Sequence, residues 1–358
     1  MSARKRFRYH FEPEKGWMND PNGLVFFKGQ YHAFFQHNPY STHWDKMHWG
    51  HAVSSDLLSW KELPIALYPD KDYECEGGCF SGSAIVKNDR LYLFYTSVSD
   101  KQTQSIAFSD DGIHFTKYEG NPVITENPLG YYDFRDPKVT EIDGQYYMVT
   151  GSGSKEAGQV LLFRSENLLE WEYVGVLFEG KKYAPCIECP DFFKLDDKYV
   201  LMFSKMEEPS RTTHFVIGDF ENGKLINTAI SRPEWGRDFY APQTMVDSNR
   251  RIIIGWMYHW GKKTPAGCPF AGALSIPREL KPVGSKIYNY PVKEAQPLMK
   301  RKSRYVSVKG NELIVHPKMR KKRKFRIPQI DSIDIFEDKK SVEIFINGGE
   351  ISISEWIV

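Results

Sequence analysis

The stretch DPNGLVFFKGQYHAFFQ, residues 20–36, contains the pattern that decides the fold. A polar segment, an apolar run, a Lys-Gly turn and a run rich in aromatic rings are typical of two β-strands joined by a tight turn. The pattern recurs as SGSAIVKNDRLYLFYTS (81–97), DPKVTEIDGQYYMVTGS (136–152), CPDFFKLDDKYVLMFSK (189–205) and APQTMVDSNRRIIIGWM (241–257). Aligned on Tyr31, Leu91, Tyr146, Tyr199 and Ile252, the copies lie 60, 55, 53 and 53 residues apart.

A second element recurs out of phase with the first and predicts a turn into an outer strand. Its copies are SSDLLSW (54–60), FSDDGIHF (108–115) and RSENLLEW (164–171). Each repeat therefore holds about four short strands, and no helical stripe separates the repeats. A fixed long period favours a radial arrangement over a β-sandwich, so the sequence predicts an all-β, five-bladed β-propeller.

The C-terminal part of the chain departs from the repeat. The fifth copy ends near ALSIPRELKPV (273–283), and residues 282–296 have the Pro, Gly and Lys content of a linker. Short strand-like runs follow, so we assign residues 1–290 to a propeller catalytic domain and residues 297–358 to a small, truncated C-terminal β-unit. The basic run KMRKKRKFR (318–326) is interpreted as a solvated hairpin rather than a nucleic-acid surface.

Composition excludes several classes of function. The 48 basic and 46 acidic residues leave a net charge of +2, which indicates neither a nucleic-acid nor a membrane partner. No apolar run approaches the roughly 18 residues of a membrane span, and the basic N-terminus lacks the apolar core of a leader. With five cysteines, an odd number, these features predict a cytoplasmic protein.

Three carboxylates occupy nearly the same place in their repeats. Asp20 and Glu188 each lie 11 residues before their alignment tyrosine, and Asp136 lies 10 before its own. Equivalent positions in a ring face one axis, so the three acids should converge at one mouth of the channel. Crowded carboxylates raise one another's pKa values, and an acid kept protonated beside one kept ionised is what glycoside hydrolysis requires. Asp before Pro is also an ordinary turn former, but three acids in register argue against turns alone.

The motifs that carry these acids resemble a known family. WMNDPNG (17–23), FSGSA (80–84), FRDPKV (134–139), ECPD (188–191) and DFYAPQT (238–244) resemble, in this order, the signatures of glycoside hydrolase family 32, the invertases, sucrose-6-phosphate hydrolases and fructanases. The resemblance runs from about Phe7 to Pro282.

It implies a retaining hydrolase that cleaves terminal β-D-fructofuranosyl bonds through a covalent fructosyl-enzyme. Asp20 would be the nucleophile, Glu188 the general acid and base, and Asp136 a transition-state stabiliser. The implied substrate-binding residues are Asn19, Gln36, Trp44, Phe80, Ser81, Arg135, Tyr240 and Trp256. No cofactor and no metal are implied; the substrate would be a small fructoside, with sucrose, sucrose 6-phosphate and short fructooligosaccharides left open.

Alternatives remain at this stage. The cysteines at 75, 79, 186 and 189 could form a zinc site, but their spacing is irregular. His43, His48 and His51 could be metal ligands, but pocket hydrogen bonding is the favoured interpretation. An inverting pentosan hydrolase of the arabinanase or xylosidase type and a non-catalytic sugar-binding propeller are the rival functions.

The C-terminal part of the chain differs from the pattern of this family. Family members carry a longer C-terminal β-sandwich than the roughly sixty residues after Gln296, although VEIFINGGE (342–350) resembles a late strand of that module. Because uncovered apolar strands aggregate, the shortened unit is expected to pair with the propeller or with a second copy as a homo-oligomer.

Overall fold

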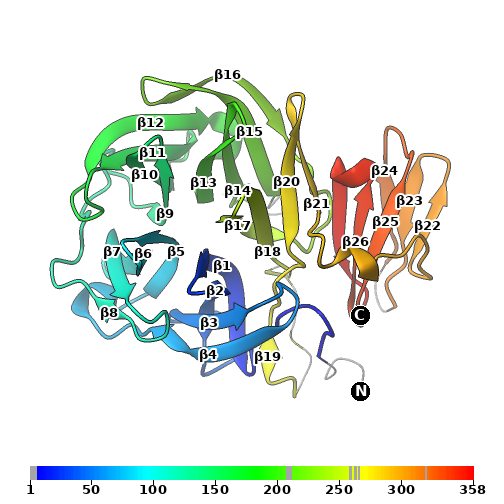
Figure 1. Ribbon diagram of the computed structural model, residues 1–358, viewed down its shortest axis with the longest axis horizontal. Coiled ribbons are helices and arrows are strands. Elements are labelled where there is room, and N and C mark those ends of the chain that lie inside the picture. Colours follow the sequence, from blue (N-terminus) through cyan, green and yellow to red (C-terminus); the bar gives the residue numbers. More distant parts are fainter. Residues whose placement is uncertain (1–5, 207–211, 258–259, 262–263, 265–266, 319–320) are drawn as a thin grey trace.

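The fold was analysed in a computed structural model that describes residues 6–206, 212–257, 260–261, 264, 267–318 and 321–358. Within these residues the strands form seven sheets. Five of the sheets surround a central axis, and two smaller ones lie beside the ring (Figure 1). The fivefold arrangement confirms the β-propeller predicted from the five copies of the repeat.

Each blade is built from four antiparallel strands in chain order from the axis outward. Blade one contains β1 (Gly16–Phe27), β2 (Gln30–Asn38), β3 (His48–Ser54) and β4 (Trp60–Leu67). Blade two contains β5 (Gly78–Lys87), β6 (Arg90–Val98), β7 (Gln102–Ser109) and β8 (Thr116–Lys117). Blade three contains β9 (Phe134–Ile142), β10 (Gln145–Gly153), β11 (Gly158–Ser165) and β12 (Glu172–Gly180). Blade four contains β13 (Ile187–Leu195), β14 (Lys198–Lys205), β15 (Thr212–Glu221) and β16 (Lys224–Ser231).

Blade five contains β17 (Tyr240–Asp247), β18 (Arg250–Trp256), β20 (Arg278–Val283) and β21 (Lys286–Pro291). The interpretation of residues 282–296 as a linker is therefore wrong for its first half, because β21 is the outer strand of this blade. Pro282 and Gly284 suggested a break in regular structure. Pro282 lies beyond the part of β20 that pairs with β18, so its missing N–H removes no hydrogen bond between those two strands.

A late segment of the chain closes the ring. The innermost strands β1, β5, β9, β13 and β17 contact one another in sequence, and β17 returns to β1. The short strand β19 (Phe270–Ala271) pairs in parallel with the start of β1, where Gly16 faces Phe270. The first blade is thus completed by residues that follow the fifth copy of the repeat.

The second repeated element forms the predicted turn into the outer strand. In blades one, two and three the side chains of Asp56, Asp111 and Asn167 accept hydrogen bonds from two backbone N–H groups further along the turn. The backbone N–H groups of the turn have no partner strand, and the side-chain oxygen accepts their hydrogen bonds instead. This is the physical reason for an Asp or Asn at this position.

The C-terminal unit is a small sandwich of two three-stranded sheets. One sheet contains β22 (Val306–Lys309), β23 (Glu312–Val315) and β24 (Arg323–Arg326), and the other contains β25 (Ile333–Glu337), β26 (Ser341–Ile346) and β27 (Ile351–Trp356). Leu313 and Val315 of the first sheet share a core with Ile344 and Ile353 of the second, which confirms the small C-terminal β-unit. Short 3-10 turns lie at Asp72–Glu74, Lys181–Tyr183, Gln296–Leu298 and Asn347–Gly349.

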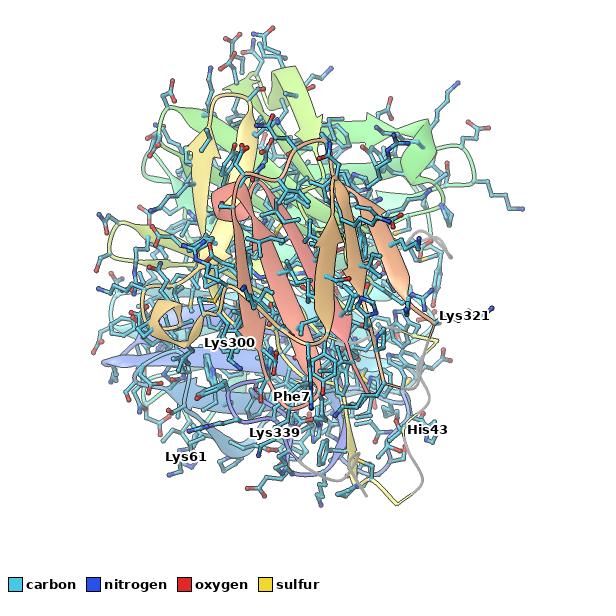
Figure 2. The ribbon with its side chains drawn as sticks, turned by 90° about the vertical axis from the view of Figure 1, so that its right-hand side faces the viewer. Phe7, His43, Lys61, Lys300, Lys321 and Lys339 are labelled. Carbon is cyan, nitrogen blue, oxygen red and sulfur yellow. The ribbon has the colours of Figure 1, made fainter. Side chains whose placement is uncertain are left out.

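Lys321, within the basic run, lies at the edge of this unit (Figure 2). Residues 319 and 320 of the run lie outside the described residues. The rest forms a loop and β24, and the exposed Lys324 pairs with Glu312 at 3.0 Å. This arrangement is a solvated hairpin edge.

A buried ionic cluster joins the sandwich to the propeller. His10 places Nδ1 2.9 Å from an Asp338 oxygen and Nε2 2.7 Å from Glu343. Arg278 of blade five contacts Glu343 at 2.5 Å and Glu234 at 2.8 Å. Figure 2 shows the neighbouring Phe7 beside the loop at Lys339. Burial lowers the pKa of His10, but the two carboxylates outweigh it and raise the pKa to about 9.

Candidate active site

Every innermost strand contains a bulge at the same level of the channel. The pairing register shifts between Met18 and Pro21 in β1, Cys79 and Gly82 in β5, Arg135 and Lys138 in β9, Glu188 and Asp191 in β13, and Tyr240 and Gln243 in β17. A bulge re-aims side chains and is often found next to active sites. In blades three to five one bulge residue has a left-handed φ: 64° at Asp136, 48° at Cys189 and 46° at Ala241.

The bulges correct the predicted register of the three acids. Aligned by strand pairing, Asn22, Lys138 and Asp191 occupy equivalent positions, because each faces the third residue after its alignment tyrosine. Asp20 and Asp136 therefore share one position, and Glu188 lies one residue earlier, with Cys189 in the shared slot. The count from Tyr31 was misleading because β1 has an additional register shift between Asn22 and Val25.

Asp20 lines a cleft, and one of its oxygens is held by hydrogen bonds whereas the other has no partner among the described residues. Ser81 Oγ donates to Asp20 Oδ2 at 2.8 Å, and the thiol of Cys189 lies 3.5 Å from the same oxygen. Asp20 Oδ1 is buried and has no hydrogen-bond partner among the described residues. Burial raises the pKa of Asp20, hydrogen bonds from Ser81 and Asn19 oppose this, and the charge of Glu188 adds to it.

Asp136 is held by a backbone N–H from blade four and by the side chain of Thr96 from blade two. The N–H of Cys189 donates to Asp136 Oδ2 at 2.8 Å, and the N–H of Asp136 donates to Thr96 at 2.9 Å. Burial raises the pKa of Asp136 to about 7; Arg135 lowers it, and the charges of Glu188 and Asp20 raise it. The carboxyl group is therefore rigidly placed and close to its titration point at neutral pH.

Glu188 is held on both of its oxygens. The guanidinium of Arg135 donates to Oε1 at 3.2 Å, and the hydroxyl of Tyr240 makes a short hydrogen bond to Oε2. The same hydroxyl oxygen lies 3.2 Å from the carbonyl oxygen of Lys205, a second acceptor for its single proton. Arg135 and Tyr240 thus orient this carboxyl group from opposite sides.

A cleft of about 450 Å³ brings most of the predicted site residues together. Nine of the eleven line it: Asn19, Asp20, Gln36, Trp44, Phe80, Ser81, Arg135, Asp136 and Glu188. Trp44, 45% exposed, meets the ring of Phe80 at 5.9 Å between centroids, so the cleft has an aromatic wall above a polar floor. Carboxylates below and rings beside them suit a sugar, which is polar at its edge and apolar on its face.

The other two predicted residues lie behind the cleft. Tyr240 does not line the cleft but hydrogen-bonds to Glu188, which does. Trp256 has no exposed surface and packs edge to face against Trp17 and Trp260. Trp256 supports the wall of the cleft and does not line it.

Four lining residues were not predicted: Gln102, Tyr132, Met206 and Trp260. Gln102 begins β7 and accepts the N–H of Phe134 at 2.8 Å, so it braces the strand that carries Arg135 and Asp136. The other three lie in loops between strands, where the repeat gives no signal. Tyr132 is 61% exposed, which could have marked it as a binding residue only after the fold was known.

The described residues contain no cluster of three His, Cys, Asp or Glu side chains arranged to hold a metal ion. Cys189 lies between two carboxylates, whereas Cys75 is exposed elsewhere. In the same part of the chain no helix is long and apolar enough to cross a membrane.

A five-bladed propeller with three carboxyl groups in one aromatic-walled cleft defines the class of the protein as a carbohydrate-active hydrolase. The chain matches the family model for the glycosyl hydrolases family 32 N-terminal domain over residues 10–291. It therefore belongs to glycoside hydrolase family 32, as the motifs indicated.

Individual relatives agree with this assignment. A sucrose-6-phosphate hydrolase of Escherichia coli is 35% identical over 98% of this chain and 88% of its own length, and a raffinose invertase of the same organism is 38% identical over 82% and 66%. The β-fructofuranosidase of Bombyx mori, solved with sucrose, superposes with a TM-score of 0.87 at 31% identity, covering 99% of this chain and 89% of that one. The first alignment spans 427 positions, more than the 358 residues of this chain, so that relative carries segments that this chain lacks.

Proposed function

We propose that this enzyme hydrolyses terminal β-D-fructofuranosyl bonds with retention of configuration, and that its substrates are sucrose, sucrose 6-phosphate or short fructooligosaccharides. The proposal rests on a difference in hydrogen bonding between the carboxyl groups of Asp20 and Glu188. Asp20 has one buried oxygen without a partner, whereas both oxygens of Glu188 are held. A carboxylate oxygen that no hydrogen bond occupies suits a nucleophile, and an oriented carboxyl group suits proton transfer.

In the first step Asp20 Oδ1 attacks the anomeric C2 of the fructosyl unit. The C2–O glycosidic bond breaks, its electron pair goes to the leaving oxygen, and Glu188 gives that oxygen its proton. Ser81 holds the other oxygen of Asp20, so the attacking atom keeps its direction. Burial raises the pKa of the neighbouring Asp136 to about 7, so the group of three carboxyls is partly protonated near neutral pH.

In the second step water attacks C2 of the fructosyl-enzyme. Glu188, now ionised, takes a proton from the water, and the bond between C2 and Asp20 breaks. Asp136 would stay close to the fructose hydroxyls and stabilise the positive charge that develops on the ring. Its backbone hydrogen bonds from Cys189 and to Thr96 hold it without reorganisation.

The two parts of the chain have different roles in this proposal. We assign catalysis to residues 1–290 and a supporting role to the β-unit of residues 297–358. Whether that unit also joins two copies of the chain remains a prediction, which the mass of the protein in solution would check.

The test compares two carboxyl variants on two substrates. Asp20→Asn should abolish fructose release from sucrose and from an aryl β-fructofuranoside with an activated phenolate leaving group. Glu188→Gln should abolish it from sucrose but retain bond cleavage in the aryl fructoside, because that leaving group needs no proton. Turnover of sucrose by either variant at the wild-type rate would refute the roles.

Stereochemistry separates the proposal from an inverting reaction. Proton NMR of the first product should show β-fructofuranose, and α-fructofuranose would favour a single displacement. Parallel assays of sucrose, sucrose 6-phosphate and a fructose disaccharide would then identify the preferred leaving group.

A further inference from the structure

The segment that leads into Tyr240 is attached to the last strand of the C-terminal unit. The N–H of Trp235 donates to Ser352 O at 2.8 Å, and the N–H of Asp238 donates to Ser354 O at 3.1 Å. Glu234 forms a parallel bridge with Ser352. Residues 234–238 therefore run beside β27 as an additional edge segment of its sheet.

The approach of these two segments is close. A Cβ atom on Gly236 would lie 2.2 Å from the nitrogen of Ser354, so glycine is needed where the segment passes β27. The contact joins the sandwich to the start of β17, the strand that carries Tyr240 at the channel mouth.

Trp356, at the end of β27, holds both strands of the inner hairpin of blade five. Its backbone N–H donates to Asp238 Oδ2 at 2.8 Å, two residues before Tyr240. Its indole N–H donates to the carbonyl of Met257 at 2.7 Å, one residue after Trp256. Tyr240 and Trp256 face each other at the open end of the hairpin. The two hydrogen bonds therefore hold both strands at that end.

We propose that Trp356 is a positioning residue for proton transfer. It acts through β17 and β18, and it keeps the hydroxyl of Tyr240 against Glu188. The inference rests on the proposed function, in which Glu188 is the acid and base. When the residues that hold a reacting group shift by about 1 Å, the reaction rate can fall about a hundredfold, even though the reacting groups themselves are intact.

The direction of the indole hydrogen bond favours this role over simple packing. Trp356 is buried and meets Phe7 edge to face at 5.0 Å, which any large ring could do. Its indole hydrogen bond, in contrast, is directed at the hairpin end and not at the sandwich core. The contact is thus specific to the geometry of the site.

The test removes the indole hydrogen bond and keeps the ring. Trp356→Phe should lower kcat for sucrose about tenfold with KM within about twofold, because an interaction that matters in the transition state is lost. Trp171→Phe is the matched control, since the indole of Trp171 also donates to a backbone carbonyl, Leu168 O at 3.0 Å, but on an outer turn of blade three. Equal kcat values for the two variants would overturn the proposal.

A double-mutant cycle separates positioning from general loosening. In a Tyr240→Phe background, Trp356→Phe should reduce kcat by less than twofold, because the contact through which it acts has gone. Independent, multiplicative effects would contradict the proposal. In the burst of phenolate from the activated aryl fructoside Trp356→Phe should match wild type, since cleavage of that bond needs no proton from Glu188.

A second pair of variants serves if Trp356→Phe does not fold. Asp238→Ala removes the acceptor for the Trp356 N–H, and Asp238→Asn keeps an oxygen there. Asp238→Asn should restore most of the kcat that Asp238→Ala loses, and equal losses in the two variants would count against positioning.

The two proposals can fail separately. If Glu188→Gln still hydrolyses sucrose, the proposed function fails. If Glu188→Gln behaves as expected and Trp356→Phe has the same kcat as Trp171→Phe, only this inference fails.

Discussion

Replacing His10 by glutamine should remove a pH-dependent part of the stability of the protein. His10 is buried between Asp338 and Glu343, at 2.9 and 2.7 Å. Glutamine can hydrogen-bond to both acids but cannot carry a charge. The variant therefore tests whether a protonated imidazole links the N-terminal segment to the sandwich.

The magnitude follows from the pKa of His10. The carboxylates raise the pKa from 6.5 to about 9, so the folded protein binds a proton that the unfolded chain releases above 6.5. At about 1.4 kcal/mol per pH unit, this difference corresponds to about 3 kcal/mol. A raised pKa stabilises fully below pH 6.5, and the contribution is lost as the pH rises through about 9.

The assay is urea unfolding followed by tryptophan fluorescence between pH 6 and pH 10. The free energy of unfolding of wild type should exceed that of His10→Gln by about 3 kcal/mol at pH 6, and the difference should shrink towards pH 10. Other groups with raised pKa values, such as Glu355, titrate in both proteins and cancel in the comparison. A difference that stays constant across this range would refute the argument.

Three further outcomes are expected. Lys138→Met should destabilise the fold by about 3–5 kcal/mol in thermal unfolding, because Lys138 Nζ lies 3.1 Å from Asp191, which would be left buried without this salt bridge. Adding Asp191→Leu should recover much of that loss. Gly82→Ala should prevent stable folding, seen as loss of soluble protein, because the new Cβ would lie 1.9 Å from the carbonyl oxygen of Phe94. Trp44→Ala should raise KM for sucrose with thermal stability unchanged, since the ring is a half-exposed wall of the cleft.

The repeat made the fold predictable from sequence. Five copies with aromatic strands and a fixed turn chemistry leave few architectures, and the side chains of Asp56 and Asn167 form the same turn in different blades. The convergence of the three acids followed from the repeat as well. The exact position of Glu188 did not, because one additional bulge in β1 shifts the count and only strand pairing reveals it.

The sequence patterns did not predict the loops that line the cleft or the contacts between distant parts of the chain. Tyr132 and Trp260 reach the cleft from connections between strands, outside the strands that carry the repeat. The contacts of His10 join residues more than three hundred positions apart, and no local period encodes such a pair. Trp256 belongs to an inner strand, but the neighbouring rings of Trp17 and Trp260 separate it from the cleft.

The pairing of β19 with β1 has a consequence for synthesis of the chain. The strand that carries Asp20 is made first, but its neighbour in the ring, Phe270–Ala271, emerges from the ribosome much later. Domains tend to fold from the N-terminus as they are made, yet blade one must wait with an unpaired edge until most of the chain has appeared. Until then Gly16 and Trp17 at the start of β1 lack their strand partner, so slow translation before residue 270 should increase dependence on chaperones.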